Sequence, residues 1–351
     1  MSMQGIYIGK RLISNTELPL FAPDIGTFFN QDMGRAETII KKLVLAGVEL
    51  VKGEILHTAE IALKSDHTDA YFCPSKGVIK ENYRQIIERK VVPLENYAKL
   101  FNLCKQYQLP FLVSVYDDKG ARFALEQGAV ALKIASSNVT HYPLISYVAS
   151  LGLPMIIDTG RANIDEIARA LGWAKAAGAK DVIIEHSPKA PPAPVSEQNL
   201  KFMCSLANMF GVPVGLSDHH AGTEMLLSAT ALGASLLEKG VFLDDQPMDQ
   251  DVAHGMPVSQ VAKLLKQIKL IHEGLGSGLP NYFNHGHPAR MGWIARRDLP
   301  IGHIIRLEDL TYAFPGVGVK VEETPLALGW RLVQDKQAGE VIAWQDLKAG
   351  N

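Results

Sequence analysis

Short apolar runs alternate with longer amphipathic segments along roughly the first 275 residues of the chain. The short runs are nearly continuous in Val, Ile and Leu, which is typical of strands buried on both faces of a parallel sheet. The pattern predicts strands over residues 19–26, 48–55, 111–117, 130–137, 154–160, 181–187, 212–218 and 235–241.

Helical periodicity fills the intervals between these strands. Asn163 is followed three residues later by Glu166, which is the sequence of a capping box at a helix start. Several intervals close on a glycine before the next strand, as helices commonly do; these are Gly128, Gly178, Gly211 and Gly233. We expect helices over residues 33–46, 94–108, 165–177 and 222–232.

Eight strand–helix units in about 250 residues predict an α/β fold of the (β/α)8, or TIM-barrel, type. An open, doubly wound sheet is the alternative, but no G-x-G-x-x-G motif follows the first strand. Residues 56–93 exceed an ordinary strand–helix connection. We therefore expect a lid or a local insertion over the barrel mouth there.

The composition of the chain changes after the barrel. We expect a barrel domain over residues 1–275, a linker rich in Gly, Asn, His and Pro over 276–290, and a small domain over 291–351. The small domain carries a weak repeat, DLPIGHIIRLEDL and DKQAGEVIAWQDL, which predicts two pseudo-symmetric halves. A chain this short buries little surface alone, so it should pack on the barrel or on a partner subunit.

Composition excludes several classes of protein. Hydrophobic residues make up 47% and charged residues 21%, which excludes a disordered chain, a collagen and a coiled coil. The net charge of -2 gives no basic surplus for nucleic acid or an anionic membrane. The three cysteines have no metal-site spacing, and we find no signal peptide or membrane-length apolar segment. We expect a cytoplasmic protein.

Nearly every predicted strand ends in a polar or charged residue. The carboxyl ends of barrel strands carry the active site, so convergence of these side chains on one rim predicts one here. Lysines among them indicate an anionic ligand such as phosphate or carboxylate. The rim residues are Asp24, Lys52, Glu54, Lys133, Ser136, Ser137, Asp158, Thr159, Glu185, His186, Ser217, Asp218, His219, Glu238 and Lys239.

Two of these positions leave alternatives open. Lys133 lies between Leu132 and Ile134 in a buried strand and needs a partner, so it is either a Schiff-base amine or a phosphate clamp. The run Asp218-His219-His220 is either a set of metal ligands or an ordinary loop. No second ligand follows at the i+4 spacing of a helical zinc site.

Four segments together resemble the sialic acid synthase family: VALKIASSNVTHYPLI, PMIIDTG, GVPVGLSDHHAGTEM and ALGASLLEKGVFLD. This family includes the N-acetylneuraminate, legionaminate and pseudaminate synthases and the spore coat polysaccharide biosynthesis protein E group. The segment MGWIARRDLPIGHIIRLEDL is similar to its antifreeze-like (SAF, β-clip) domain. The resemblance extends from about residue 20 to the end of the chain.

The resemblance implies a TIM barrel followed by an SAF domain that caps the barrel of the partner in a domain-swapped homodimer. It implies condensation of phosphoenolpyruvate with an N-acetylated aminosugar, releasing phosphate and giving a 2-keto sugar acid for surface polysaccharide. A divalent metal, manganese or magnesium, would polarise the aldehyde as a Lewis acid.

Several roles follow by position from the resemblance. Lys52 and Lys133 match lysines that contact phosphoenolpyruvate, Ser136 matches the serine after KIA, and Ser217 matches the serine of the SDH motif. His219 matches a metal-binding histidine. Asp24 takes the place of a glutamate that contacts the acceptor sugar.

The chain also departs from the family pattern. Gly240 replaces the second metal-binding histidine, and Phe28-Phe29 replaces an Asn-His pair. We expect weaker metal binding, or a substitute ligand from among Glu54, Asp158, Glu185 and His254.

Two further departures lie at the phosphate and acceptor ends of the site. Asp158 replaces a phosphate-contacting serine and Lys189 a Ser or Asn, and we expect these two side chains to pair. Phe314 replaces an arginine that reaches the acceptor's N-acyl side. This indicates an acceptor that is less polar there, or none.

Three readings remain open from the sequence. The first is a divergent synthase that uses phosphoenolpyruvate and a sugar. The second is a non-catalytic relative that binds these ligands, and the third is an aldolase with a Schiff base on Lys133.

Overall fold

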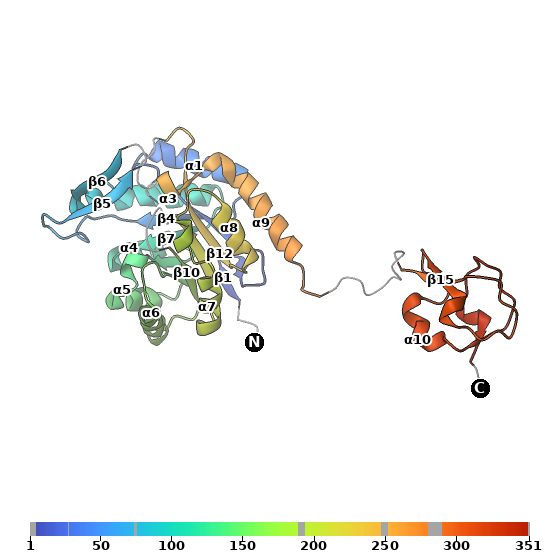
Figure 1. The fold of residues 1–351 in the computed structure, drawn as a ribbon. Coiled ribbons are helices and arrows are strands. Elements are labelled where there is room, and N and C mark those ends of the chain that lie inside the picture. Colours follow the sequence, from blue (N-terminus) through green and yellow to red (C-terminus); the bar gives the residue numbers. More distant parts are fainter. Residues whose placement is uncertain are drawn as a thin grey trace. The chain divides into compact units, whose positions relative to one another are not determined.

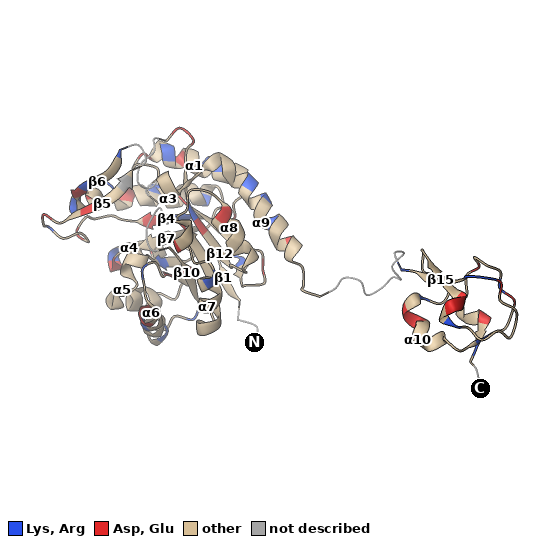
Figure 2. Ribbon diagram, viewed as in Figure 1, with Lys and Arg blue, Asp and Glu red and all other residues tan. Residues whose placement is uncertain are grey.

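The computed structural model describes residues 5–26, 28–73, 76–188, 194–246, 252–279 and 290–349. The chain divides into two compact units, Met1–Gly276 and Ser277–Asn351, which we describe separately (Figure 1). Acidic and basic residues alternate along the ribbon of both units (Figure 2). No helix among these residues is long and apolar enough to cross a membrane.

The first unit is a closed barrel of eight parallel strands. In chain order they are β3 (Leu20–Asp24), β4 (Val51–Ile55), β7 (Phe111–Val115), β8 (Leu132–Ile134), β9 (Met155–Asp158), β10 (Val182–His186), β11 (Val214–Asp218) and β12 (Leu236–Phe242). Each pairs with the next, and β12 pairs with β3 to close the barrel. The predicted barrel is therefore confirmed, and the open sheet is wrong. All eight predicted strands form, most of them shorter than the apolar runs.

Helices surround the barrel (Figure 1). Apart from a short helix in the second connection, the described ones are α1 (Met33–Ala46), α3 (Leu94–Gln106), α4 (Asp118–Gln127), α5 (Tyr142–Ser150), α6 (Ile164–Ala176), α7 (Lys201–Phe210), α8 (Glu224–Ala231) and α9 (Val261–Leu275). The capping box of Asn163 and Glu166 is present at the start of α6. Gly128 ends α4 with a φ of 85°, a left-handed conformation that glycine adopts without strain.

Strand alternation divides the apolar residues into two layers. Ile157 and Ile184 face the helices in the larger core, whereas Ile156 and Ile183 face the barrel interior. The interior layer also contains residues of a hairpin that the sequence pattern did not reveal, β1 (Ile6–Ile8) with β2 (Arg11–Ile13). This hairpin fills the amino end of the barrel. The same alternation turns every second residue near the carboxyl ends inward.

The long second connection contains an antiparallel hairpin, β5 (Thr68–Cys73) with β6 (Gly77–Asn82), followed by α2 (Tyr83–Glu88). The expected local insertion is confirmed. Figure 1 shows the hairpin projecting beside the barrel.

The second unit surrounds the buried Trp293 with short strands: β14 (Gly292–Ala295), β15 (Leu310–Ala313), β16 (Arg331–Leu332) and β17 (Leu347–Lys348). The repeat is visible in reciprocal contacts. Asp298 accepts a hydrogen bond from the Ala338 amide at 2.8 Å, and Asp335 accepts one from the Ile301 amide at 2.6 Å. The two halves are thus pseudo-symmetric, as predicted. Most of the predicted linker lies outside the described residues.

Candidate active site

Strand register concentrates ionisable side chains inside the carboxyl end of the barrel. Asp24 lies beside Lys52, and Asp158 lies beside Glu185, on neighbouring strands. We call the six side chains gathered here the charge cluster: Asp24, Lys52, Lys133, Asp158, Glu185 and Glu238. All are buried except Asp24, which is partly buried.

Lys133 is the centre of this cluster. Its side chain is 2% exposed, and its Nζ lies 2.6 Å from Glu185, 2.7 Å from Glu238 and 3.1 Å from Asp158. It also donates to the Ser217 hydroxyl at 3.3 Å. Lys133 thus has the partners that its buried position requires.

Lys52 forms the second centre. Its Nζ lies 2.7 Å from Asp24 and 3.5 Å from Glu238. One oxygen of Glu238 therefore serves both lysines. The two ammonium groups are held side by side by one shared carboxylate, an arrangement that suits a small, multiply charged anion.

Burial and pairing shift the pKa values of the cluster. Burial would lower the pKa of Lys133, but Glu185, Glu238 and Asp158 outweigh it and hold that pKa well above its ordinary value. Burial would raise the pKa of Glu238, but Lys133 and Lys52 bring it to about 2. A Schiff-base lysine needs a depressed pKa, so this environment disfavours the aldolase reading.

The carboxyl groups of Asp24 and Glu185 have raised pKa values, in contrast to that of Glu238. Burial raises the pKa of Asp24 to about 6, with Lys52 opposing the rise. Burial also raises the pKa of Glu185 to about 8; Lys133 opposes this, while Glu238 and Asp158 add to it. The cluster has more carboxyl groups than ammonium groups, and the raised pKa of Glu185 leaves that carboxyl group mostly protonated at pH 7.

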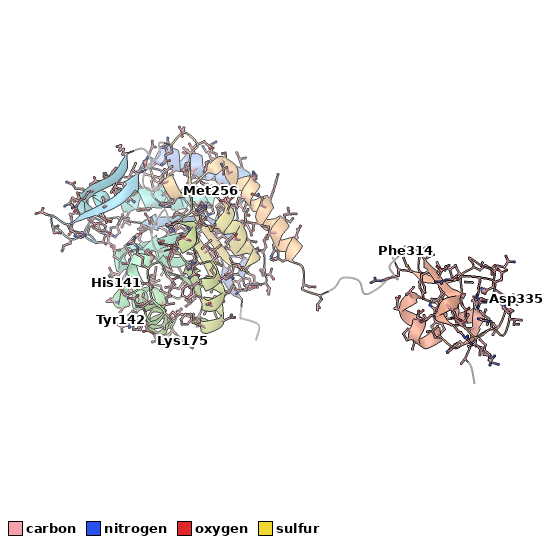
Figure 3. All side chains as sticks on the ribbon, viewed as in Figure 1. His141, Tyr142, Lys175, Met256, Phe314 and Asp335 are labelled. Atoms are coloured by element: carbon pink, nitrogen blue, oxygen red, sulfur yellow. The ribbon has the colours of Figure 1, made fainter. Side chains whose placement is uncertain are left out.

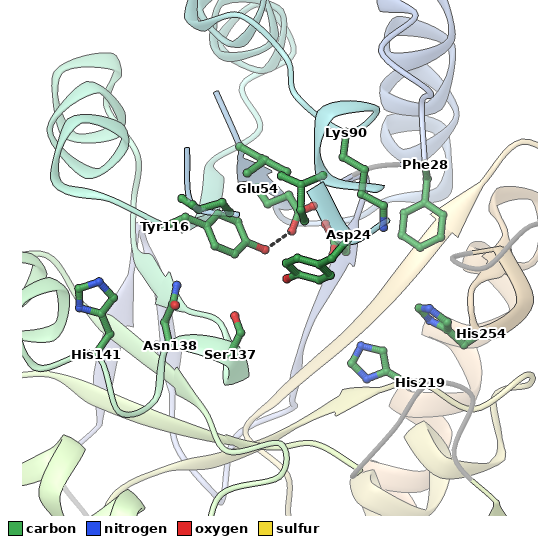
Figure 4. A pocket seen from close by; sticks show the side chains of 14 residues that line it. Asp24, Phe28, Glu54, Lys90, Tyr116, Ser137, Asn138, His141, His219 and His254 are labelled. Carbon is green, nitrogen blue, oxygen red and sulfur yellow. Dashed lines mark hydrogen bonds between the residues drawn. The ribbon is translucent and has the colours of Figure 1, made fainter. Parts of the chain in front are cut away.

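A pocket of about 560 Å³ lies at this end of the barrel (Figure 4). Barrel residues such as Asp24 and Glu54 form part of its lining, and Glu54 accepts a hydrogen bond from the Tyr116 hydroxyl at 2.9 Å. The insertion contributes another wall, made of Leu56, Ile61, Tyr83, Ile87 and Lys90. The insertion thus borders the barrel mouth, as expected.

Two histidines stand together in this pocket. The ring centroids of His219 and His254 are 5.0 Å apart. Burial, aided by Lys133, lowers the pKa of His219 to about 4, so its imidazole is neutral at pH 7. Both histidines line the pocket, and an imidazole nitrogen is a ligand that borderline metals accept. Figure 4 shows the pair on the same side as Phe28.

Phe28 explains why position 240 is a glycine. A Cβ built at Gly240 would lie 2.1 Å from the Phe28 ring, and one at Gly255 would lie 3.1 Å from it. The ring is buried with Phe242 and Val252. A histidine at 240 is thus excluded by the ring of Phe28, so these two departures from the family pattern are coupled.

The contacts of the four expected substitute metal ligands show which of them lies beside His219. Asp158 and Glu185 point at Lys133, and Glu54 binds Tyr116, which leaves His254 beside His219. Over the described ranges, no group of three or more His, Cys, Asp or Glu side chains is placed to hold a metal ion. Among the described residues, the pocket therefore brings two imidazole rings close together, those of His219 and His254.

Several predicted site residues lie elsewhere. His186 faces α7, where its Nε2 is 2.8 Å from the Gln198 carbonyl oxygen and its ring contacts Phe202. Asp218 is buried against Lys239 at 2.8 Å. These two alternate with the inward residues, and neither is among the described residues that line the pocket.

The remaining predicted residues are placed as follows. Thr159 is buried and donates to the Glu185 carbonyl at 3.0 Å, which fixes the end of β9. Ser136 lies near Gly160, whose Cβ would be 3.2 Å from the Ser136 hydroxyl. Lys189, and with it the expected pair with Asp158, lies outside the described residues. Phe314 is on the second unit and is 59% exposed (Figure 3).

Sequence reasoning missed other pocket residues. Tyr116 and Asn138 line the pocket; Tyr116 lies in the predicted strand 111–117, directly after the observed β7, and Asn138 directly follows the predicted strand 130–137, so the strand-end rule could have found them. Tyr83 and Lys90 come from the insertion, whose path no local pattern determines.

Comparison with known proteins settles the family. The NeuB family model matches residues 39–279, and the SAF domain model matches residues 290–348. This chain belongs to the NeuB family. It is 27% identical over 336 residues to the N,N'-diacetyllegionaminic acid synthase of Legionella pneumophila, covering 93% of this chain and 94% of that one.

Solved structures agree with the NeuB fold. The putative spore coat polysaccharide biosynthesis protein E of Chromobacterium violaceum gives a TM-score of 0.74 at 20% identity, covering 94% of this chain and 99% of that one. The N-acetylneuraminic acid synthetase of Leptospira borgpetersenii gives a TM-score of 0.71 at 22% identity, covering 80% of this chain and 93% of that one.

Proposed function

We propose that this NeuB-family chain condenses phosphoenolpyruvate with an N-acetylated aminosugar or a related aldose, giving a 2-keto sugar acid and phosphate. The observation that carries the proposal is the pair of buried ammonium groups, Lys52 and Lys133, beside a roomy polar pocket at the carboxyl end of the barrel. Relatives named as legionaminic and pseudaminic acid synthases support this class of reaction.

The anion would be held at the charge cluster. Lys52 and Lys133 supply two fixed positive charges, and Ser217 supplies a hydroxyl between Lys133 and Glu238. Phosphate and carboxylate oxygens would replace some of the carboxylates that now surround these lysines. Holding the enol carbon of phosphoenolpyruvate in a fixed position lowers the entropic cost of bringing it to the acceptor carbonyl.

The acceptor would occupy the outer part of the pocket. Glu54 and Tyr116 form a hydrogen-bonded pair there, and Asn138 and His141 line the same space. These groups suit the hydroxyl groups of a sugar. Ile61 and Ile87 give the insertion wall an apolar surface, which suits the carbon face of a sugar or an acyl methyl group.

A divalent metal, manganese or magnesium, would be held by His219 and His254, with the remaining ligands from substrate or water. When bound, it would polarise the acceptor carbonyl as a Lewis acid. The neutral state of His219 leaves a lone pair for this role.

The wider setting of the reaction is also proposed. We place it in the cytoplasm, in the biosynthesis of a surface polysaccharide. The exposed Phe314 would cap the barrel of a partner in a domain-swapped homodimer.

Phosphate release tests the proposal. The full chain is incubated with phosphoenolpyruvate, manganese or magnesium, and single N-acetylated hexosamines or plain aldoses. Release that requires one sugar supports the synthase, and Lys133→Met is expected to abolish it. A rise in melting temperature with phosphoenolpyruvate, without release for any sugar, would favour the non-catalytic relative. A product trapped by borohydride with pyruvate would instead support the aldolase.

A further inference from the structure

The charge cluster is unbalanced in a way that the proposed reaction does not explain. Four carboxyl groups, those of Asp24, Asp158, Glu185 and Glu238, face two ammonium groups. An anionic substrate would make the imbalance worse, because a phosphate ester alone brings a charge of about −1.5 to −2 at pH 7. Buried like charges of this kind are not held without compensation.

Glu185 is the acid that the proposed reaction leaves without a task. It is 0% exposed, and Lys133 at 2.6 Å is the ion-pair partner of its Oε2. Its other oxygen, Oε1, is buried and has no hydrogen-bond partner among the described residues. An anion arriving at Lys133 would compete directly with Glu185 for that ammonium group.

The surroundings of Glu185 decide what happens next. Lys133 faces it from β8, Asp158 from β9 and Glu238 from β12, while β11 contributes the neutral Ser217 to the same cluster. If Lys133 turns to the substrate, Glu185 keeps two acidic neighbours and loses its cation. A buried carboxylate in that position binds a proton.

We propose that phosphoenolpyruvate binds the form of the protein in which Glu185 carries a proton opposite Lys133, and that binding takes this proton up wherever the free protein lacks it. The inference rests on the proposed function. The protonated carboxyl group then has an O–H to donate to a substrate oxygen. Glu185 becomes a substrate-binding acid, a role that the sequence motifs do not give it.

The pKa of Glu185 near 8 in the free protein sets the range of the test. Below that pH the proton is already present, and above it the proton must be taken up. We expect the affinity for phosphoenolpyruvate to be flat at pH 7 and to fall by up to tenfold per unit above pH 8. The phosphate group itself is fully ionised in this range, since its second pKa is about 6.

Isothermal titration calorimetry measures the proton directly. The full chain is titrated with phosphoenolpyruvate at pH 8.5 in two buffers with different ionisation enthalpies, and the difference in heat gives the protons taken up. A pKa near 8 leaves Glu185 about one quarter protonated in the free protein at this pH, so we expect uptake of about three quarters of a proton per phosphoenolpyruvate. Glu185→Gln, a permanent analogue of the protonated acid, should take up almost none and should bind more tightly than the wild type at pH 9.

Two further variants separate this role from a structural one. Asp158→Asn removes a negative neighbour, which should move the onset of weaker binding to lower pH. Glu273→Gln, on the exposed surface of α9, is the matched control and should behave as the wild type. Equal affinity of Glu185→Gln and wild type at pH 7 would show that the variant site is intact.

The outcomes distinguish the inference from the function on which it rests. Binding with no proton uptake, or uptake that persists in Glu185→Gln, would overturn the role of Glu185 and leave the synthase proposal standing. Failure of the wild type to bind phosphoenolpyruvate at any pH, with or without manganese, would overturn both.

Discussion

The contact between Phe28 and Gly240 offers a quantitative test of the site's packing. In Gly240→Ala, the new methyl group would lie 2.1, 2.5 and 3.0 Å from three carbons of the Phe28 ring. The ring has little room to move, because it is buried with Phe242 and Val252 and also lies close to Gly255. Overpacking of this kind costs about 1–3 kcal/mol.

The cost should disappear when the ring is removed. Phe28→Ala alone should destabilise the barrel by about 3–5 kcal/mol, as is usual for a buried aromatic residue. In that background, Gly240→Ala should cost less than about 0.5 kcal/mol. The coupling energy of the double-mutant cycle is then about 1–3 kcal/mol in favour of the double variant.

Scanning calorimetry of the full chain, following the barrel transition, measures these differences. A loss of 1 kcal/mol lowers Tm by roughly 2–4 °C for a unit of this size, so Gly240→Ala should lower Tm by roughly 2–12 °C. Gly274→Ala is the control, since nothing lies within 4 Å of a Cβ there. An unchanged Tm in Gly240→Ala, or additive effects within about 0.5 kcal/mol, would refute the argument.

Three other predictions concern separate parts of the molecule. The pKa of Glu185 is raised on folding, so its contribution to stability falls as pH rises from about 4.5 to about 8; Glu185→Gln should melt above the wild type at pH 9 and near it at pH 4.5. His254→Gln should weaken manganese binding by more than tenfold in an EPR titration, and unchanged binding would exclude His254 as a ligand. In the second unit, hydrogen bonds led by His303 outweigh burial and lower the pKa of Asp309, so its stabilisation is present above pH 4 and is lost in more acidic solution. Asp309→Asn should therefore destabilise that unit by about 1–3 kcal/mol at pH 7 in urea unfolding, and by less at pH 3; an equal effect at both would contradict the ionic role.

The barrel could be predicted because its strands follow a simple rule. A strand buried on both faces must be apolar on both, and eight such runs were visible without any knowledge of tertiary contacts. The β1–β2 hairpin escaped because three-residue strands are too short to show a period. Its role depends on the barrel interior that it fills.

The site was predicted only in part, for the same physical reason. Apolar runs located the strand ends but did not show which of two consecutive residues at each end points into the barrel. His186 and Asp218 were therefore grouped with Glu185 and Ser217, although they face the opposite way. Deciding between the two faces requires the register of neighbouring strands, which is a long-range property of the fold.

The apolar hairpin at the amino end of the barrel has a consequence for the order of events during turnover. Ile6, Ile8 and Ile13 close that end with hydrocarbon, so charged molecules must enter and leave past the insertion at the other end. Lys52 and Lys133 are buried in the charge cluster, whereas the groups proposed to bind the acceptor line the pocket. Under the proposed function, this arrangement predicts an ordered reaction in which the anion enters first and the acceptor then blocks its exit. Steady-state kinetics would register this as inhibition by excess acceptor, competitive against the anion.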